Sequence, residues 1–214
     1  MKRVLLAAAL CIPMAVPSMA LATETAHDPF TQGSVEAGAA KAAVCSACHG
    51  PAGKSSNPEW PKLAGQSSRY TYQQLQSFKN GLRKNPLMSA QAAALSDQDM
   101  RDLAAYFAVQ PFSPGVASEA AVATAQKIYR SGDAKRELPA CAACHLPNGA
   151  GVAASGYPQL GGQHATYTAK ALRDFRELSK AELPDGNLRT MATVAGKLTD
   201  AEIEALASYV NGLQ

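Results

Sequence analysis

Cys45-Ser46-Ala47-Cys48-His49 lies in the first half of this 214-residue chain, and Cys141-Ala142-Ala143-Cys144-His145 repeats its pattern in the second. The pattern CxxCH is typical of covalent haem attachment. The two thiols add across the vinyl groups of one porphyrin, and the adjacent histidine can then bind the iron. We therefore expect two covalently bound haem c groups. The residues expected to hold them are four cysteines and two proximal histidines: Cys45, Cys48 and His49, and Cys141, Cys144 and His145.

Four cysteines could also form thioredoxin-like redox sites, zinc sites or structural disulfides. None of these explains the histidine that follows each cysteine pair. A thioredoxin-like motif also belongs at the end of a strand in a βαβ pattern, and the sequence has no convincing strand alternation. Haem attachment is therefore the favoured interpretation.

Residues 1–22 have the pattern of a secretory signal peptide. Lys2 and Arg3 precede an apolar run, and small residues lead to a cleavage sequence at Ala20-Leu21-Ala22. Cys11 lies within the apolar run, so we expect it to be removed with the signal. The four remaining cysteines match two haems, and the predicted location is the periplasm.

Charge and hydropathy limit the classes of partner. Removing the signal lowers the formal net charge from +3 to +1, which does not favour nucleic acid as a partner. The uncharged stretch 138–169 is interrupted by prolines and glycines, so we expect no transmembrane segment in the mature chain. Peripheral association with a membrane surface is left open.

The chain contains an internal repeat. Aligning the two CxxCH motifs places Pro61-Lys62-Leu63-Ala64-Gly65-Gln66 over Pro158-Gln159-Leu160-Gly161-Gly162-Gln163. After a shift of six residues, Leu95-Ser96-Asp97 falls on Leu198-Thr199-Asp200. The sequence therefore predicts a tandem duplication.

The segment Pro111-Phe112-Ser113-Pro114-Gly115 has the composition of a linker, because proline restricts helix continuation. We therefore predict an N-terminal domain over residues 23–111 and a C-terminal domain over 112–214. Each domain is expected to wrap around one haem.

Helical patterns predict an all-α fold. Ser96 with Asp99, and Thr199 with Glu202, fit capping boxes at the starts of two terminal helices. Apolar residues then follow helical spacing: Met100, Leu103, Ala104 and Phe107, and Ile203, Leu206, Ala207 and Val210. Four further helices are predicted over residues 35–44, 69–80, 120–129 and 166–178.

CxxCH after a short helix, a PxLxGQ segment, a methionine and a capped last helix resemble a class I cytochrome c domain. Two such domains behind a signal peptide resemble the dihaem cytochrome c4 family, over residues 35–214. The resemblance implies that the carbonyl oxygens of Pro61 and Pro158 accept the proximal histidine N–H groups and orient the rings. Two positions depart from the pattern: Leu146 stands where the first motif has Gly50, and Ala125 where the first half has Gly38.

The distal iron ligands are predicted from matched positions. Removing the signal leaves only three methionines, Met88, Met100 and Met191. Met88 lies seven residues before Leu95, and Met191 seven before Leu198, on what we expect to be loops before the last helices. We therefore predict Met88 and Met191 as ligands, because His/Met coordination recurs in electron-transfer cytochromes. Met100 has no counterpart and is expected in the core.

Other candidate residues have simpler interpretations. His27 lies near the predicted mature N-terminus and is expected to be solvated. His164 aligns with Ser67, so it has no place in a repeated ligand scheme, although bis-histidine haems exist. Trp60, Tyr70 and Tyr167 could contact haem propionates, but aromatic packing is favoured.

Closed His/Met coordination leaves neither iron a position for oxygen, peroxide or a substrate, so it predicts electron transfer and no enzymatic activity. The family resemblance implies a carrier from a quinol-oxidising cytochrome bc complex, or another donor, to a terminal oxidase. A dihaem peroxidase is the first alternative, but it requires one five-coordinate haem and both halves offer a methionine. A haem subunit docked permanently in a larger dehydrogenase or oxidase is the second, and nothing in the sequence excludes it.

Overall fold

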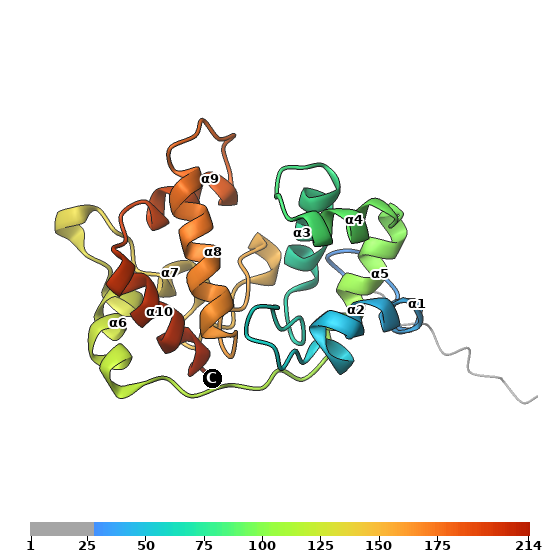
Figure 1. Ribbon diagram of the computed structural model, residues 1–214, viewed down its shortest axis with the longest axis horizontal. Coiled ribbons are helices and arrows are strands. Elements are labelled where there is room, and N and C mark those ends of the chain that lie inside the picture. The colour runs from blue at the N-terminus through green and yellow to red at the C-terminus, as the bar shows by residue number, and fades with distance from the viewer. Residues whose placement is uncertain (1–27) are drawn as a thin grey trace, which may run out of the picture.

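The computed structural model describes residues 28–214 (Figure 1). The predicted signal peptide and His27 lie outside the described residues. The described part of the chain is helical, with short 3₁₀ turns and isolated β-bridges such as Asp133–Leu138 and Val152–Tyr157, and it contains no strand. The all-α prediction is therefore confirmed.

Helices α1–α5 form one half of the molecule and α6–α10 the other, and residues 109–118 run between them along one edge (Figure 1). The helices of the first half are α1 (Val35–Lys41), α2 (Ala43–His49), α3 (Ser68–Lys79), α4 (Pro86–Ala93) and α5 (Asp97–Ala108). Those of the second half are α6 (Glu119–Ser131), α7 (Ala142–His145), α8 (Ala165–Leu178), α9 (Asn187–Ala195) and α10 (Asp200–Asn211). None of the helices in residues 28–214 is long and apolar enough to cross a membrane.

Both predicted capping boxes are present. Ser96 accepts a hydrogen bond from the Asp99 backbone N–H, and the Asp99 carboxylate accepts one from the Ser96 N–H. Thr199 and Glu202 do the same at the start of α10. Such a cap contributes about 1 kcal/mol, and it fixes where each terminal helix begins.

Two predicted details are wrong. The expected helix over 35–44 ends at Lys41, and a second helix, α2, carries the first CxxCH motif. Met88 and Met191, expected on loops, lie on the short helices α4 and α9. In α4, Pro86 occupies the first turn and the Asn85 side chain accepts from the Met88 N–H at 3.0 Å, so a local cap starts a helix that has little amphipathic pattern.

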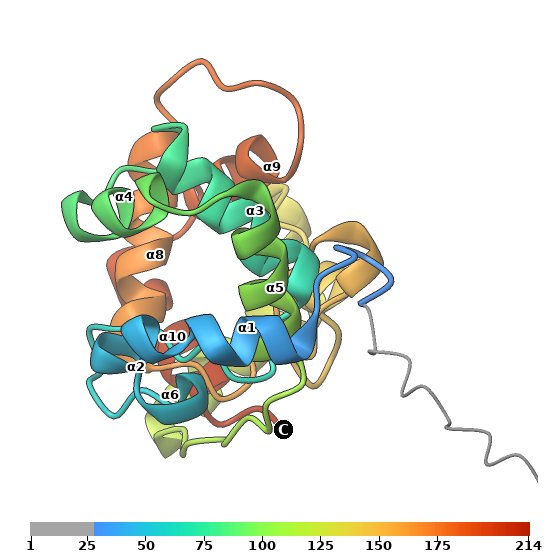
Figure 2. The ribbon, with the colours of Figure 1, turned by 90° about the vertical axis from the view of Figure 1, so that its right-hand side faces the viewer.

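The terminal helices form the core of each half. Helix α1 lies across α5 in the first half (Figure 2), and α6 packs on α10 in the second. All eight predicted core residues of α5 and α10 are buried. The α1–α5 contact is close, because an ideal Cβ on Gly38 would lie 2.0 Å from the Asp102 carbonyl oxygen. Ala125, the counterpart of Gly38, is fully buried in α6, so this departure from the pattern is accommodated by a small side chain.

Candidate haem sites

The two CxxCH segments lie on short helices. Cys45 and His49 are four residues apart on α2, so their side chains share one helix face. In the second half, Cys141 is the N-cap of α7 and His145 its last residue. None of the four motif cysteines forms a disulfide, so all four are available for addition to a porphyrin.

The surroundings of the thiols disfavour the alternative uses of CxxC. Burial raises the pKa of the Cys45 thiol, and it raises the pKa of Cys141 to about 11. A redox-active CxxC cysteine has a lowered pKa instead, because the thiolate is its reactive form. Within residues 28–214, no group of three or more His, Cys, Asp or Glu side chains is arranged to hold a metal ion.

Each motif histidine is buried and anchored by a proline carbonyl. His49 is 7% exposed and His145 is 5% exposed. The His49 Nδ1 donates to Pro61 O at 2.9 Å, and the His145 Nδ1 donates to Pro158 O at 2.9 Å. A proton on Nδ1 leaves the lone pair on Nε2, which is the form that ligates a metal. Burial also lowers the pKa of both imidazoles, which favours this neutral form.

The donor set of each half fits a haem c. Two free thiols can form the thioether links, and a neutral imidazole with Nε2 available can bind the iron. A partly buried methionine follows in each half, Met88 on α4 and Met191 on α9.

The residue after each motif adopts one backbone conformation despite different side chains. Gly50 has φ 74° and ψ 164°, and Leu146 has φ 64° and ψ 157°. This region is essentially restricted to glycine and costs another residue about 1–3 kcal/mol. The Leu146 carbonyl accepts a hydrogen bond from the buried Tyr129 hydroxyl at 2.8 Å, which helps to hold the strained backbone in place.

The remaining candidates have other contacts. Met100 is 4% exposed in the core, as expected. The His164 Nε2 donates to Ser55 O in the other half at 2.8 Å, so this nitrogen is already used. Trp60 is 36% exposed.

Tyr70 and Tyr167 lie with Arg83 at the boundary between the halves. The Arg83 Nη2 donates to the Tyr167 hydroxyl at 2.9 Å, and the Arg83 guanidinium lies 4.7 Å from the centre of the Phe78 ring. Burial raises the pKa of the Tyr70 hydroxyl above its usual value, and neighbouring Tyr167 adds to the shift. Sequence reasoning missed Arg83, because nothing in its local pattern distinguishes it from a solvated cation.

Two all-α halves, each with a CxxCH helix and a histidine held by a proline carbonyl, define a tandem c-type cytochrome with two haems. The cytochrome c family model matches residues 35–108 and 122–214. The cytochrome c4 of Pseudomonas aeruginosa is 48% identical over 181 residues, which cover 85% of this chain and 89% of that protein. The crystal structure of reduced recombinant cytochrome c4 from Pseudomonas stutzeri is similar with a TM-score of 0.80 and 47% identity, over 85% of this chain and 100% of that chain. The chain therefore belongs to the dihaem cytochrome c4 family and is an electron-transfer protein.

The name of one further relative specifies an electron donor. A Stutzerimonas stutzeri protein named thiosulfate dehydrogenase electron acceptor is 37% identical over 185 residues, which cover 84% of this chain and 82% of that protein.

Proposed function

We propose that this protein is a periplasmic carrier that takes single electrons from a quinol-oxidising cytochrome bc complex, or a similar donor, to a terminal oxidase. The observation that supports it is the matched arrangement of the two halves. Each half has a buried histidine bonded through Nδ1 to a proline carbonyl, and each has a methionine on the short helix before its last helix.

We assign the iron ligands as His49 with Met88 and His145 with Met191. The bound haems supply the one-electron Fe(III)/Fe(II) couple. The Pro61 carbonyl keeps the His49 Nδ1 proton in place, so this imidazole offers only Nε2 to the iron. A thioether sulfur is a soft ligand that favours Fe(II), and a filled sixth position denies peroxide a binding site.

The proposal includes location and domain limits. Residues 1–22 are the proposed signal peptide, and mass spectrometry of periplasmic protein should give a mature N-terminus at Thr23. A mature chain that retains Met1 would contradict export by cleavage. The proposed domains are 23–111 and 112–214, and this boundary lies in the segment that joins α5 to α6.

Methionine variants test the ligand set. Met88→Ala and Met191→Ala should each abolish the sulfur-to-iron charge-transfer band of one haem and allow that haem to bind cyanide. Met100→Leu is the matched control, because Met100 is buried in the core of α5 and is not a proposed ligand. An unchanged band in either alanine variant would contradict the assignment for that haem.

Electron exchange tests the carrier role. Purified holoprotein should be reduced rapidly by a quinol-oxidising membrane fraction and reoxidised rapidly by a terminal oxidase, with negligible peroxide turnover. Stopped-flow reduction and oxidase assays with this protein as sole donor measure both steps. Strong peroxidase activity would replace the carrier proposal with the enzyme alternative.

A dedicated acceptor of a dehydrogenase is the second candidate, which the thiosulfate dehydrogenase electron acceptor among the relatives favours. Thiosulfate-dependent reduction by a thiosulfate dehydrogenase, together with copurification with that enzyme, would support this candidate. Isolation as a free monomer that exchanges electrons with the oxidase would support the carrier.

A further inference from the structure

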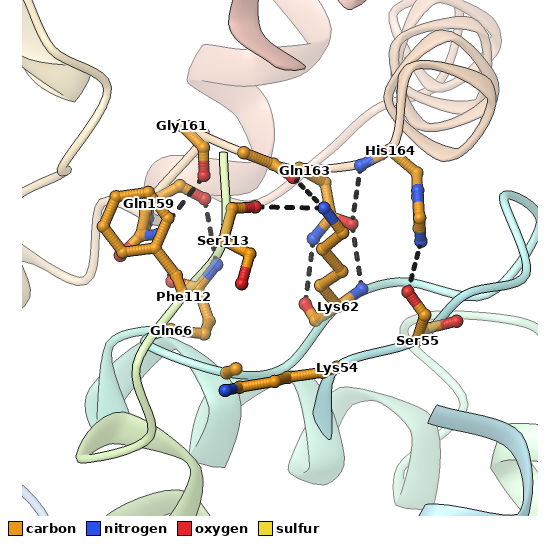
Figure 3. Close-up of a pocket in the computed structure, with 12 residues that line it drawn as sticks. Lys54, Ser55, Lys62, Gln66, Phe112, Ser113, Gln159, Gly161, Gln163 and His164 are labelled. Carbon is orange, nitrogen blue, oxygen red and sulfur yellow. Dashed lines mark hydrogen bonds between the residues drawn. The ribbon is translucent and has the colours of Figure 1, made fainter. Parts of the chain in front are cut away.

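The two PxLxGQ segments face each other across the boundary between the halves, beside a cavity of about 310 Å³ (Figure 3). The Gln163 side chain accepts from the Lys62 N–H at 2.9 Å and donates to Lys62 O at 2.9 Å. The Gln66 side chain accepts from the Gln159 N–H at 2.9 Å and donates to Gln159 O at 3.0 Å. Each side-chain amide therefore binds both the N–H and the C=O of one residue in the opposite half. A neighbouring β-strand uses the same pair of hydrogen bonds.

These contacts follow the internal repeat. Lys62 aligns with Gln159 and Gln66 aligns with Gln163, so the two halves exchange the same interaction. Each glutamine oxygen also accepts from the next backbone N–H in its own half, at 2.8 Å from Ser67 and 3.0 Å from His164. The oxygen of each side-chain amide accepts two N–H groups and its nitrogen donates to a carbonyl, so the orientation of the amide is fixed.

The pairing acts on the peptide groups that hold the motif histidines. The peptide between Pro61 and Lys62 accepts from His49 through its carbonyl and donates to Gln163 through its N–H. A peptide group is planar and rigid, so fixing its N–H also fixes the direction of its carbonyl. A hydrogen bond to the N–H also polarises the group and strengthens the carbonyl as an acceptor.

An equivalent set of contacts links Gln66 of the first half to His145 of the second. The peptide between Pro158 and Gln159 accepts from His145 and donates to Gln66. We propose that Gln66 and Gln163 are positioning residues that act across the domain boundary. Gln163 sets the carbonyl that orients His49, and Gln66 sets the carbonyl that orients His145.

The direction of the effect follows from ligand basicity. A stronger carbonyl acceptor at Nδ1 makes the imidazole a more basic iron ligand, which stabilises Fe(III). Losing the glutamine bond should therefore raise the potential of the haem in the opposite half. A purely local role, through Ser67 or His164, would instead affect the half that contains the altered glutamine.

The test measures each haem separately in the holoprotein. Gln163→Leu removes both bonds to Lys62 and should raise the potential of the first haem while leaving that of the second unchanged. NMR should show faster hydrogen–deuterium exchange of the His49 Nδ1 proton. Gln66→Leu should give the mirror result, at the second haem and at His145. Gln163→Met, which keeps an unbranched side chain, repeats the measurement if the leucine variant does not fold.

A matched control separates positioning from general loosening of the boundary. The Lys62 Nζ donates to Ser113 O at 3.1 Å and to Gly162 O at 2.8 Å. Lys62→Met removes these bonds but keeps the main-chain pairing with Gln163, so His49 proton exchange should stay slow. Shifts confined to the half that carries the altered glutamine, equal shifts in both haems, or no shift would overturn the inference.

This inference rests on the proposed histidine ligands, and the two can fail separately. The methionine variants test the ligand sets through the charge-transfer band. The glutamine variants should keep that band in both haems. If the band stays but the change in haem potential or in Nδ1 proton exchange does not occur in the opposite half, the positioning role of the glutamines is wrong and the ligand assignment stands.

Discussion

Replacing Gly38 with alanine should destabilise the first half, although alanine is the better helix former. An ideal Cβ at this position would lie 2.0 Å from the Asp102 carbonyl oxygen and 2.7 Å from the Tyr106 Cβ. A carbon and a carbonyl oxygen approach to about 3.3 Å, so α1 and α5 would have to separate by roughly 1.3 Å. The atom that is met is backbone, which cannot rotate away.

Opposing terms give the expected magnitude. Alanine in place of glycine favours a helix by about 1 kcal/mol, whereas overpacking a tight contact costs about 1–3 kcal/mol and more when backbone must move. Because the Cβ would meet backbone, we take the overpacking cost at about 3 kcal/mol, which leaves a net loss of about 2 kcal/mol in the free energy of unfolding. Guanidinium unfolding of the holoprotein, followed by circular dichroism, measures this loss as a lower midpoint for the first half.

Ala125→Gly provides the matched reverse change. Ala125 is fully buried where α6 packs on α10, so losing its methyl group should cost about 1–2 kcal/mol from helix propensity and a small void. Both substitutions should therefore destabilise the protein, whereas helix propensity alone would predict a gain for Gly38→Ala and a loss for Ala125→Gly. A Gly38→Ala variant stabilised by about 1 kcal/mol would refute the close α1–α5 contact, because propensity alone would then act.

Three further predictions concern stability. Leu146→Gly should raise the unfolding midpoint by relieving left-handed strain of φ 64°, by about 1 kcal/mol, and a lower midpoint would mean that the leucine side chain contributes more than the strain costs. Burial lowers the pKa of His164, so its contribution to stability is present above about pH 6.5 and is lost as pH falls below it. His164→Gln should therefore flatten the pH dependence of the free energy of unfolding just below about pH 6.5, and an unchanged pH profile would exclude this group. Asp102→Ala should cost about 2–3 kcal/mol in chemical denaturation, because the 3% exposed carboxylate accepts a charge-assisted hydrogen bond from the partly exposed Lys41 at 2.7 Å, and a loss under about 0.5 kcal/mol would contradict that role.

Local chemistry made much of the protein predictable from its sequence. The CxxCH motifs indicated two haems, and the capping boxes located the starts of α5 and α10. Each of these signals depends on residues within a few positions of one another. Helices α4 and α9 are short, α4 has little amphipathic pattern and α9 has no side-chain cap, so the only local signal for either helix was the Asn85-Pro86 start of α4.

Contacts between distant segments could not be read from the sequence. The repeat aligned Gln66 with Gln163 but did not indicate that each side chain would pair with the opposite half. That pairing joins residues 93 and 101 positions apart, and it exists only because the halves dock with their PxLxGQ segments facing each other. Arg83 meets Tyr167 for the same reason. The sequence alone therefore determined the haem motifs and the helical class, because these depend on local residue chemistry. It also determined the duplication, which the alignment of the two halves shows directly. Only the tertiary structure determined that each half holds a peptide group of the other, because that contact depends on how the two halves are oriented relative to one another.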